Sequence, residues 1–126
     1  MQGRAGGTIL VVDDEAIVRE TCESMLERLG FATVGARDGR EALARFEAHR
    51  DAIVAVVLDL AMPVMNGEEA LRALRAQRPA LPVVVTSGFY SAEAVARLRA
   101  EPALELVRKP YVVADLEDAL ARLLTP

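Results

Sequence analysis

The chain has 126 residues, of which 52% are hydrophobic and 27% are charged, and its formal net charge is −4. This length and composition predict one globular domain with a single core, and they exclude a disordered chain. The negative net charge argues against a general nucleic-acid-binding surface. Cys22 is the only cysteine, which excludes an internal disulfide, and we interpret it as a buried thiol on a helix rather than a redox site.

The sequence gives no sign of a membrane segment or of secretion. No apolar run approaches the ~20 residues that a membrane-spanning helix requires, and no signal peptide is visible. We therefore expect a cytoplasmic protein. Residues 1–7 are small, polar and rich in glycine, which is typical of a flexible leader or linker, and the domain is expected over residues 8–126.

Apolar runs and amphipathic patterns alternate along the chain. Four of the five apolar runs lack the alternation of a half-exposed strand, which indicates strands that are covered on both faces. Two of the helical segments begin at the capping residues Asp38 and Ser91, and the first helical segment ends at Gly30. In chain order the predicted elements are a strand at 8–12, a helix at 15–30, a strand at 32–36, a helix at 38–50, a strand at 53–58, a helix from 67 that stops before Pro79, a strand at 82–86, a helix from 91 that stops before Pro102, a strand at 104–107 and a helix at 114–124.

Five alternations of strand and helix predict a parallel sheet with helices on both faces, which is a three-layer α/β sandwich. In such a sheet, ligands bind beyond the carboxyl ends of the strands, near the point where the strand order reverses. Polar residues gather at these predicted ends. They are Asp13 and Asp14 after the first strand, Asp59 after the third, Thr86 and Ser87 around the end of the fourth, and Lys109 after the fifth.

Three carboxylates, a hydroxyl and an ammonium suit phosphoryl transfer. Carboxylates that crowd together raise one another's pKa unless a cation lies among them, and oxygen ligands with open positions suit Mg²⁺. A carboxylate beside Mg²⁺ can attack a phosphoryl group and form an acyl phosphate. Lys109 is the only lysine in a chain with 15 lysine and arginine residues, and its compact ammonium suits a phosphoryl oxygen better than a planar guanidinium does.

Each of these residues also has a structural interpretation. Asp13 and Asp14 could cap a helix, Asp59 could begin a turn, and Ser87 precedes a glycine as in ordinary turns. An acid at the end of an apolar strand is nonetheless costly unless it is paired or bound to a metal. We therefore favour the functional interpretation of the set. His49, the only histidine, is interpreted as a solvated residue, so a phosphoryl donor is expected from another protein.

Four segments of the chain resemble the response-regulator receiver domain of two-component signalling: "ILVVDDE", "VVLDLAMPVMNG", "PVVVTSGF" and "VRKPY". They occur in the order and at the spacing usual for that family, and the resemblance covers residues 8–124. It implies a flavodoxin-like fold, a five-stranded parallel sheet of strand order 2-1-3-4-5 with five helices. It also implies a phosphorylation-dependent signalling switch, which is a regulatory phosphoacceptor rather than an enzyme.

The resemblance assigns a role to each candidate residue. It implies that Asp59 accepts the phosphoryl group from a histidine of a partner kinase. It implies that Ser87, rather than Thr86, is the switch hydroxyl, and that Lys109 contacts the phosphoryl group.

The same resemblance implies Mg²⁺ as the cofactor. Asp14 and Asp59 would bind the ion directly together with the backbone carbonyl of Ala61, and Asp13 would contribute through a water molecule.

Three positions bear on how such a switch would behave. The family often has an aromatic residue three positions before the lysine, where this chain has Leu106, so the usual coupling of that aromatic to the switch hydroxyl is not expected. Ala61 and Phe89 lie near the expected entry point of an attacking water. Ala61 has no side chain to orient that water and Phe89 can obstruct it, so we expect a long-lived phosphoryl state.

Other classes of function remain open at this point. A phosphate-independent interaction module would share the fold without using the acids. A phosphatase with an aspartyl nucleophile commonly has a second acid two residues after the nucleophile, where this chain has Ala61. A flavin-binding relative would need a phosphate-binding loop after the first strand, and the sequence has none there.

The resemblance also implies the partners. They are a sensor histidine kinase or a histidine phosphotransfer domain, with output or dimer contacts on the fourth helix, fifth strand and fifth helix. The "TSGF" segment and the glycine-rich leader resemble receivers fused to the C-terminus of sensor histidine kinases, and a single-domain regulator is the alternative. No direct contact with nucleic acid is expected.

Overall fold

A computed structural model describes residues 6–62 and 65–125 of the chain. Its strands and helices alternate as the sequence predicts. The strands are β2 (Thr8–Val12), β3 (Ala32–Ala36), β4 (Ile53–Asp59), β5 (Val83–Ser87) and β6 (Leu104–Arg108). The helices are α1 (Ala16–Arg28), α2 (Gly39–Ala48), α3 (Gly67–Gln77), α4 (Ala92–Arg99) and α5 (Val113–Leu124).

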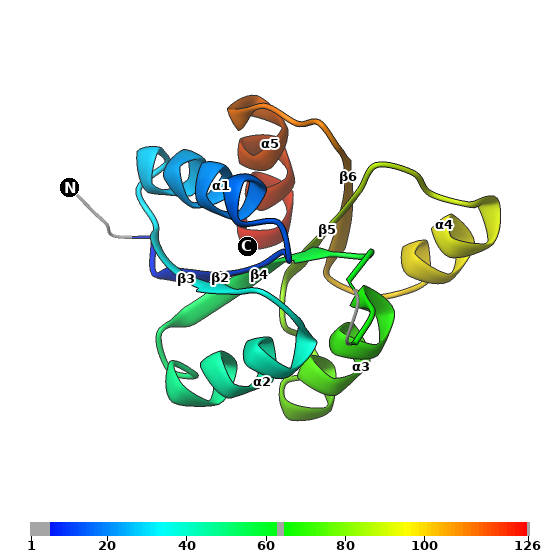
Figure 1. The fold of residues 1–126 in the computed structure, drawn as a ribbon, viewed down its shortest axis with the longest axis horizontal. Helices are drawn as coiled ribbons and strands as arrows, with labels where there is room; N and C mark the ends of the chain where they lie inside the picture. Colours follow the sequence, from blue (N-terminus) through cyan, green and yellow to red (C-terminus); the bar gives the residue numbers. More distant parts are fainter. Residues whose placement is uncertain (1–5, 63–64, 126) are drawn as a thin grey trace.

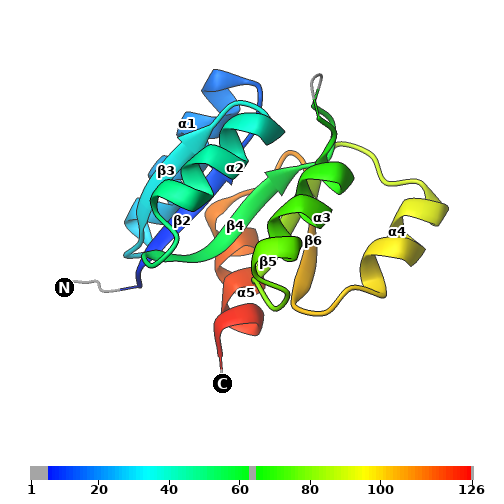
Figure 2. The same ribbon diagram turned by 90° about the horizontal axis from the view of Figure 1, so that it is seen from below.

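The strands form one parallel sheet in the order β3-β2-β4-β5-β6. Counted along the chain, this is the predicted order 2-1-3-4-5, and the flavodoxin-like fold is confirmed. Helices α1 and α5 lie on one side of the sheet, and α2 and α3 lie on the other (Figures 1 and 2). Helix α4 lies near the edge strand β6 (Figure 1), and its Leu98 joins the apolar cluster on the α2–α3 side. The strand order reverses between β2 and β4, so a ligand site is expected at the carboxyl ends of these two strands.

Both faces of the sheet are buried in apolar clusters, which explains why the strands read as continuous apolar runs. Alternate residues of β2 divide between the two clusters: Leu10 joins the α2–α3 side, while Ile9 and Val11 join the α1–α5 side. Cys22 lies in the second cluster and is buried, and burial raises the pKa of its thiol to about 11. The interpretation of Cys22 as a buried core thiol is confirmed.

Local capping explains several helix boundaries. The Asp38 side chain accepts a hydrogen bond from the backbone N–H of Glu41, and the Ser91 side chain caps α4 in the same way. Gly30 follows the last turn of α1 with φ +101°, a left-handed conformation that favours glycine. These three capping residues are the ones that the sequence indicates.

The apolar residues of segment 15–30 recur at helical spacing, which predicts one buried stripe that begins at Ile17. In the structure, however, 80% of the surface of Ile17 is exposed. Ile17 lies in the first turn of α1 and lines the same pocket as Lys109, which follows β6. Ile17 therefore belongs to the surface around the strand ends rather than to the core.

Two further findings concern the chain as a whole. None of the helices within residues 6–62 and 65–125 is long and apolar enough to cross a membrane. Residues 1–5 of the predicted leader lie outside the described residues. Its last two residues join the sheet region, because the Gly6 N–H donates to the carbonyl oxygen of Gly30 and the Gly7 carbonyl accepts from the N–H of Ala32.

Candidate functional site

The strand register brings two carboxylates together at the reversal point of the sheet. Val12 pairs with Leu58, so the next residues along these parallel strands, Asp13 and Asp59, end up side by side. Both are buried, with only 3% of the surface of each exposed. Two buried acids in contact are unfavourable unless a cation neutralises them.

Lys109 supplies a cation between these acids. Its Nζ lies 2.9 Å from Oδ2 of Asp13 and 3.3 Å from Oδ1 of Asp59. The Lys109 backbone N–H donates to the carbonyl oxygen of Ser87 at 2.8 Å, and this bond extends the β5–β6 ladder to the lysine. Burial alone would lower the pKa of Lys109, but the hydrogen bond to Asp13 and the charges of Asp59 and Asp13 raise it above its usual value.

The charge of one ammonium does not fully offset the cost of the buried acids. Burial, and then the charge of Asp13, raises the pKa of Asp59 to about 6, although Lys109 and the long Ala61 N–H contact, 3.4 Å from Oδ1, act in the opposite direction. The Asp59 carboxylate is therefore short of positive charge and of hydrogen-bond donors. A divalent cation at this place would lower its energy.

A third acid completes a set of oxygen donors suited to such a cation. Asp13, Asp14 and Asp59 each offer a carboxylate oxygen, and these oxygens lie within 4.8 Å of one another. Asp14 is exposed while the other two are buried, so one side of the cluster is open to solvent. Oxygen-only donors with an open side fit Mg²⁺, which keeps several of its waters.

The predicted switch hydroxyl lies at the end of the neighbouring strand. Ser87 is buried, and its Oγ donates to the Phe89 carbonyl oxygen at 2.6 Å and accepts from the Phe89 N–H at 3.2 Å. Thr86, the other hydroxyl that the sequence places here, is buried and pairs with Asp59 in the sheet. In this structure the Ser87 hydroxyl is engaged with its own loop rather than with the acids.

Comparison with known proteins places this arrangement in a family. The family model described as the response regulator receiver domain matches residues 9–121. The chain belongs to the response regulator receiver domain family. A receiver is typically a regulatory phosphoacceptor rather than an enzyme, and its acidic pocket corresponds here to the Asp13, Asp14 and Asp59 cluster.

Individual relatives agree with this assignment. The transcriptional regulatory protein PdtaR of Mycobacterium tuberculosis is 34% identical over 113 residues, which cover 89% of this chain and 54% of PdtaR. The response regulator MprA of Mycolicibacterium vanbaalenii is 41% identical over 116 residues, covering 91% of this chain and 48% of MprA. The structure of the chemotaxis protein CheY4 of Vibrio cholerae superposes with a TM-score of 0.86 at 30% identity and covers 94% of this chain and 99% of that chain.

This receiver spans about half the length of the two curated relatives named above. By name, PdtaR and MprA are regulators and CheY4 is a chemotaxis protein, and none of these three is named as a sensor kinase. The placement of this receiver at the C-terminus of a hybrid kinase is therefore not supported by them, and it stays a prediction.

Two contacts around the acidic pocket of the receiver were not anticipated from the sequence. The Arg19 guanidinium donates to the backbone carbonyl of Asp13 at 2.9 Å, which ties the first turns of α1 to the pocket. Glu15 lies 4.0 Å from Nζ of Lys109, and its backbone N–H donates to Oδ1 of Asp13. The acids of "VVDDE" could have suggested Glu15, whereas no local pattern points to Arg19, because Asp13 precedes α1.

Gly67 holds the backbone beneath Asp59 in place. A Cβ at this position would lie 2.5 Å from the Asp59 carbonyl oxygen and 2.5 Å from Cα of Leu60, while the Gly67 N–H donates to the Leu60 carbonyl at 2.9 Å. The first residue of α3 thus packs directly against the backbone of Asp59. No side chain fits between them.

We expect Gly67→Ala to destabilise the receiver by about 1–3 kcal/mol, because the new methyl group clashes with backbone rather than with a movable side chain. Urea unfolding followed by circular dichroism measures the change. Gly88→Ala is the matched control, since a Cβ there meets nothing within 4 Å. Equal stabilities of the two variants would contradict the close approach at Gly67.

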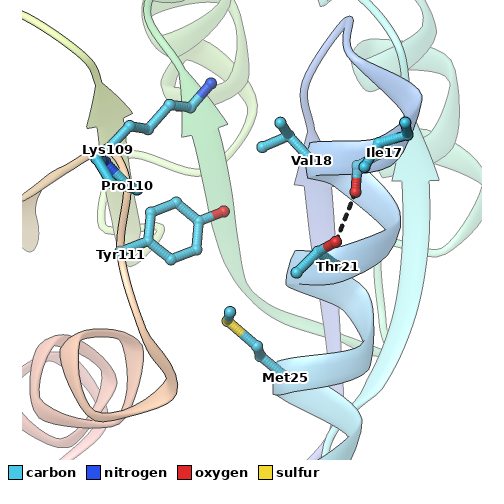
Figure 3. A pocket seen from close by; sticks show the side chains of 7 residues that line it. All are labelled: Ile17, Val18, Thr21, Met25, Lys109, Pro110 and Tyr111. Atoms are coloured by element: carbon cyan, nitrogen blue, oxygen red, sulfur yellow. Dashed lines mark hydrogen bonds between the residues drawn. The ribbon is translucent and has the colours of Figure 1, made fainter.

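An apolar groove borders the acidic pocket. Its cavity volume is about 410 Å³, and it runs between α1 and the segment that follows β6 (Figure 3). Figure 3 shows the Lys109 amine at one end of the groove and Met25 at the other, with the Thr21 hydroxyl turned back to the Ile17 carbonyl rather than into the groove. The lining residues are Ile17, Val18, Thr21, Met25, Lys109, Pro110 and Tyr111.

Proposed function

We propose that Asp59 is the phosphoacceptor of a phosphorylation-dependent switch and that a phosphohistidine of a partner protein is the donor. The observation that carries this proposal is the position of the Asp59 carboxylate, which is buried between Asp13 and Lys109 at the point where the strand order reverses. Its pKa of about 6 leaves it ionised at neutral pH and able to act as a nucleophile.

The chemical step is a transfer between two acceptors. An oxygen of the Asp59 carboxylate attacks the phosphorus atom, an O–P bond forms, and the N–P bond to the donor imidazole breaks, with the electron pair of that bond remaining on the imidazole. Lys109 lies where its ammonium can neutralise a phosphoryl oxygen. Ser87 lies at the end of the adjacent strand. Its hydroxyl can donate a hydrogen bond to another phosphoryl oxygen once it turns away from the Phe89 carbonyl.

Asp14 and Asp59 would hold Mg²⁺ directly with the backbone carbonyl of Ala61, and Asp13 would contribute through water. When bound, the ion supplies positive charge that offsets the repulsion among the carboxylates and the phosphoryl oxygens. The support for this cofactor is the donor set itself: three carboxylates with oxygens within 4.8 Å of one another and one solvent-facing member.

The phosphatase alternative is weaker on the same geometry. A leaving group would need a proton from an acid close to the nucleophile, and the residue two positions after Asp59 is Ala61, which is exposed and has no acidic side chain. We therefore propose a regulatory phosphoacceptor that assists only its own phosphorylation and dephosphorylation.

The deciding experiment is the intact mass of the chain after incubation with acetyl phosphate, with and without Mg²⁺. We expect one phosphoryl adduct that requires Mg²⁺, and peptide mapping should place it on the segment that contains Asp59. Asp51→Asn, a change at an exposed aspartate, is the control and should leave the adduct unchanged. If no condition yields an adduct, the phosphate-independent module becomes the better description.

We also propose that the groove beside Lys109 seats an apolar helix of the phosphohistidine-bearing partner. A donor histidine has to bring its phosphoryl group to Asp59, so its protein must cover the surface next to the pocket. The groove begins at Lys109 itself, and Ile17 extends its apolar wall outward with 80% of its surface exposed. An exposed isoleucine at this place is unfavourable in the free receiver and favourable under a partner.

Ile17→Arg is therefore expected to slow phosphoryl transfer from a histidine phosphotransfer domain by about tenfold or more, as for a central apolar contact of an interface. The rate with acetyl phosphate should stay unchanged, because Ile17 contacts the partner and not the phosphoryl group. Leu124→Arg, at the end of α5, is the control for adding a surface charge. A variant that loses both rates equally would contradict a docking role for Ile17.

For the protein as a whole, we propose a cytoplasmic receiver domain over residues 8–126. By the names of PdtaR and MprA, regulation of transcription is one output to test, and attachment to a kinase is another. The surface of α4, β6 and α5 is the proposed place for output or dimer contacts.

A further inference from the structure

Tyr90 ties the loop after β5 to the two last strands of the sheet. Its hydroxyl lies 2.7 Å from the carbonyl oxygen of Val85 in β5 and 2.9 Å from that of Val107 in β6. A phenol has one proton, so these two acceptors share it or exchange it. Burial raises the pKa of Tyr90, and the hydroxyl therefore remains a donor at neutral pH.

The same loop connects the Ser87 hydroxyl to the start of α4 in four residues. Ser87 Oγ makes both of its hydrogen bonds with the backbone of Phe89, which directly precedes Tyr90. Ser91 directly follows Tyr90, and its side chain caps α4 by accepting from the N–H of Ala94. Along the chain, the Ser87 hydroxyl is therefore followed by the turn at Phe89, by the Tyr90 phenol that anchors the loop to the sheet, and by Ser91, which caps α4.

Leu106 occupies the place where many receivers carry an aromatic residue. It is half-buried in β6, pairs with Val85 and packs against the same apolar cluster as Tyr90. An aliphatic side chain at this position cannot donate a hydrogen bond to the loop. On this side of the sheet, the aromatic residue with a hydroxyl is instead Tyr90, which lies in the loop after β5.

We propose that Tyr90 is the positioning residue that transmits the state of the Ser87 hydroxyl to α4 in this receiver. The proposal rests on Asp59 accepting a phosphoryl group, as argued above. Ser87 has one proton and gives it to the Phe89 carbonyl in this structure. If it donates to a phosphoryl oxygen at Asp59, the Phe89 carbonyl loses that bond and the turn that positions Tyr90 opens.

When the turn between Ser87 and Phe89 opens, the Tyr90 side chain changes its position. Tyr90 then no longer holds the loop against the carbonyls of Val85 and Val107, and Ser91 and α4 become free to move. Helix α4 has only eight residues, with Ala94 and Leu98 as its buried residues, and Arg97 joins it to Glu68 of α3 through an exposed ion pair. A short helix with a small buried face is readily displaced when its anchor is released.

Hydrogen exchange of the α4 backbone amides, measured by mass spectrometry before and after phosphorylation with acetyl phosphate and Mg²⁺, tests this role. In the native chain, phosphorylation should speed exchange in the peptide that covers residues 88–99. In Tyr90→Phe, which keeps the ring and removes the hydroxyl, that peptide should exchange fast already without phosphate, and the phosphorylation-dependent difference should be lost. Thr33→Val removes a hydroxyl that bonds Glu27 in another part of the fold, and it should retain the full difference.

A second measurement needs no substitution for its main result. In protein labelled with 3-fluorotyrosine, the ¹⁹F resonance of Tyr90 should shift on phosphorylation, and Tyr90→Phe identifies which of the two tyrosine resonances it is. Intact mass confirms the adduct in each sample. An unchanged resonance, or a Tyr90→Phe variant with the native difference in α4 exchange, would overturn the role of Tyr90 while the phosphoacceptor stands. A native chain without any adduct would overturn both proposals.

Discussion

The Asp59→Asn variant should take up no phosphoryl group and should also be more stable than the native receiver, by about 1–3 kcal/mol near pH 8 in the absence of Mg²⁺. Loss of the nucleophile explains the first effect, because an amide does not attack phosphorus under these conditions. The second effect follows from the cost of ionising Asp59 beside Asp13 inside the protein. The carboxylate that phosphorylation requires at position 59 is therefore expected to lower the free energy of unfolding of the receiver.

The sign of the pH dependence follows from the direction of the pKa shift. The pKa of Asp59 is about 6 in the folded receiver against its usual value of 3.8, so the folded chain holds the proton more tightly than the unfolded chain does. The stability of the native receiver should therefore fall as the pH rises from about 4 to about 6, and the full cost remains at higher pH. Asparagine does not titrate, so the difference between variant and native should be largest near pH 8 and small near pH 4.

Urea unfolding at several pH values, with and without Mg²⁺, measures this difference. Mg²⁺ should stabilise the native receiver and reduce the advantage of Asp59→Asn, because the proposed ion offsets the repulsion that the substitution removes. Asp51→Asn, at an exposed position, should stay within about 0.5 kcal/mol of native at each pH. A variant that is no more stable than native near pH 8 would show that Lys109 already compensates the buried acids.

The fold could be read from the sequence because its local signals agree with one another. The apolar runs give strands whose ends match the structure to within about one residue, and Asp38, Ser91 and Gly30 mark helix ends as their chemistry dictates. Most of the differences occur at the strand ends that carry the site. Asp59 and Ser87 continue β4 and β5 by one residue each, because their backbones still pair although their side chains are polar.

The acids and the lysine of the site could also be predicted, because parallel strands bring their carboxyl ends to one edge. The sequence could not give the orientation of side chains around them. The Ser87 hydroxyl turns to Phe89, and Tyr90 reaches the carbonyls of two strands, because the loop after β5 folds back on the sheet. Ile17 fits an apolar stripe by its spacing, but it lies exposed in the first turn of α1. Such features depend on tertiary geometry that periodicity does not encode.

Lys109→Met should have the opposite effect on stability to Asp59→Asn. Methionine keeps most of the length of the side chain but removes the ammonium that lies 2.9 Å from Asp13 and 3.3 Å from Asp59. Removing one partner of a buried ion pair leaves uncompensated charge, so we expect a loss of about 2–4 kcal/mol near pH 8. The loss should be smaller near pH 5, because Asp59 then takes up a proton instead of remaining charged.

The same substitution should slow phosphoryl uptake from acetyl phosphate by about 10²-fold or more, as expected when one charged group that stabilises the transferring oxygens is removed. Intact mass against time measures the rate in the presence of Mg²⁺. Arg99→Met, which removes an exposed cation from α4, should change neither the rate nor the stability appreciably. A native rate in Lys109→Met would restrict the lysine to a structural role beside Asp13.

The two substitutions together show whether the acids and the lysine act as one unit. If Lys109 stabilises the receiver mainly by neutralising Asp59, its replacement should cost less in an Asp59→Asn background than in the native chain, and the stabilities should be non-additive. Lys109 would then be offsetting a repulsion that the site itself creates. If the cost is the same in both backgrounds, Asp13 is the partner that matters for folding, and the contact with Asp59 is available to be exchanged for a contact with a phosphoryl oxygen.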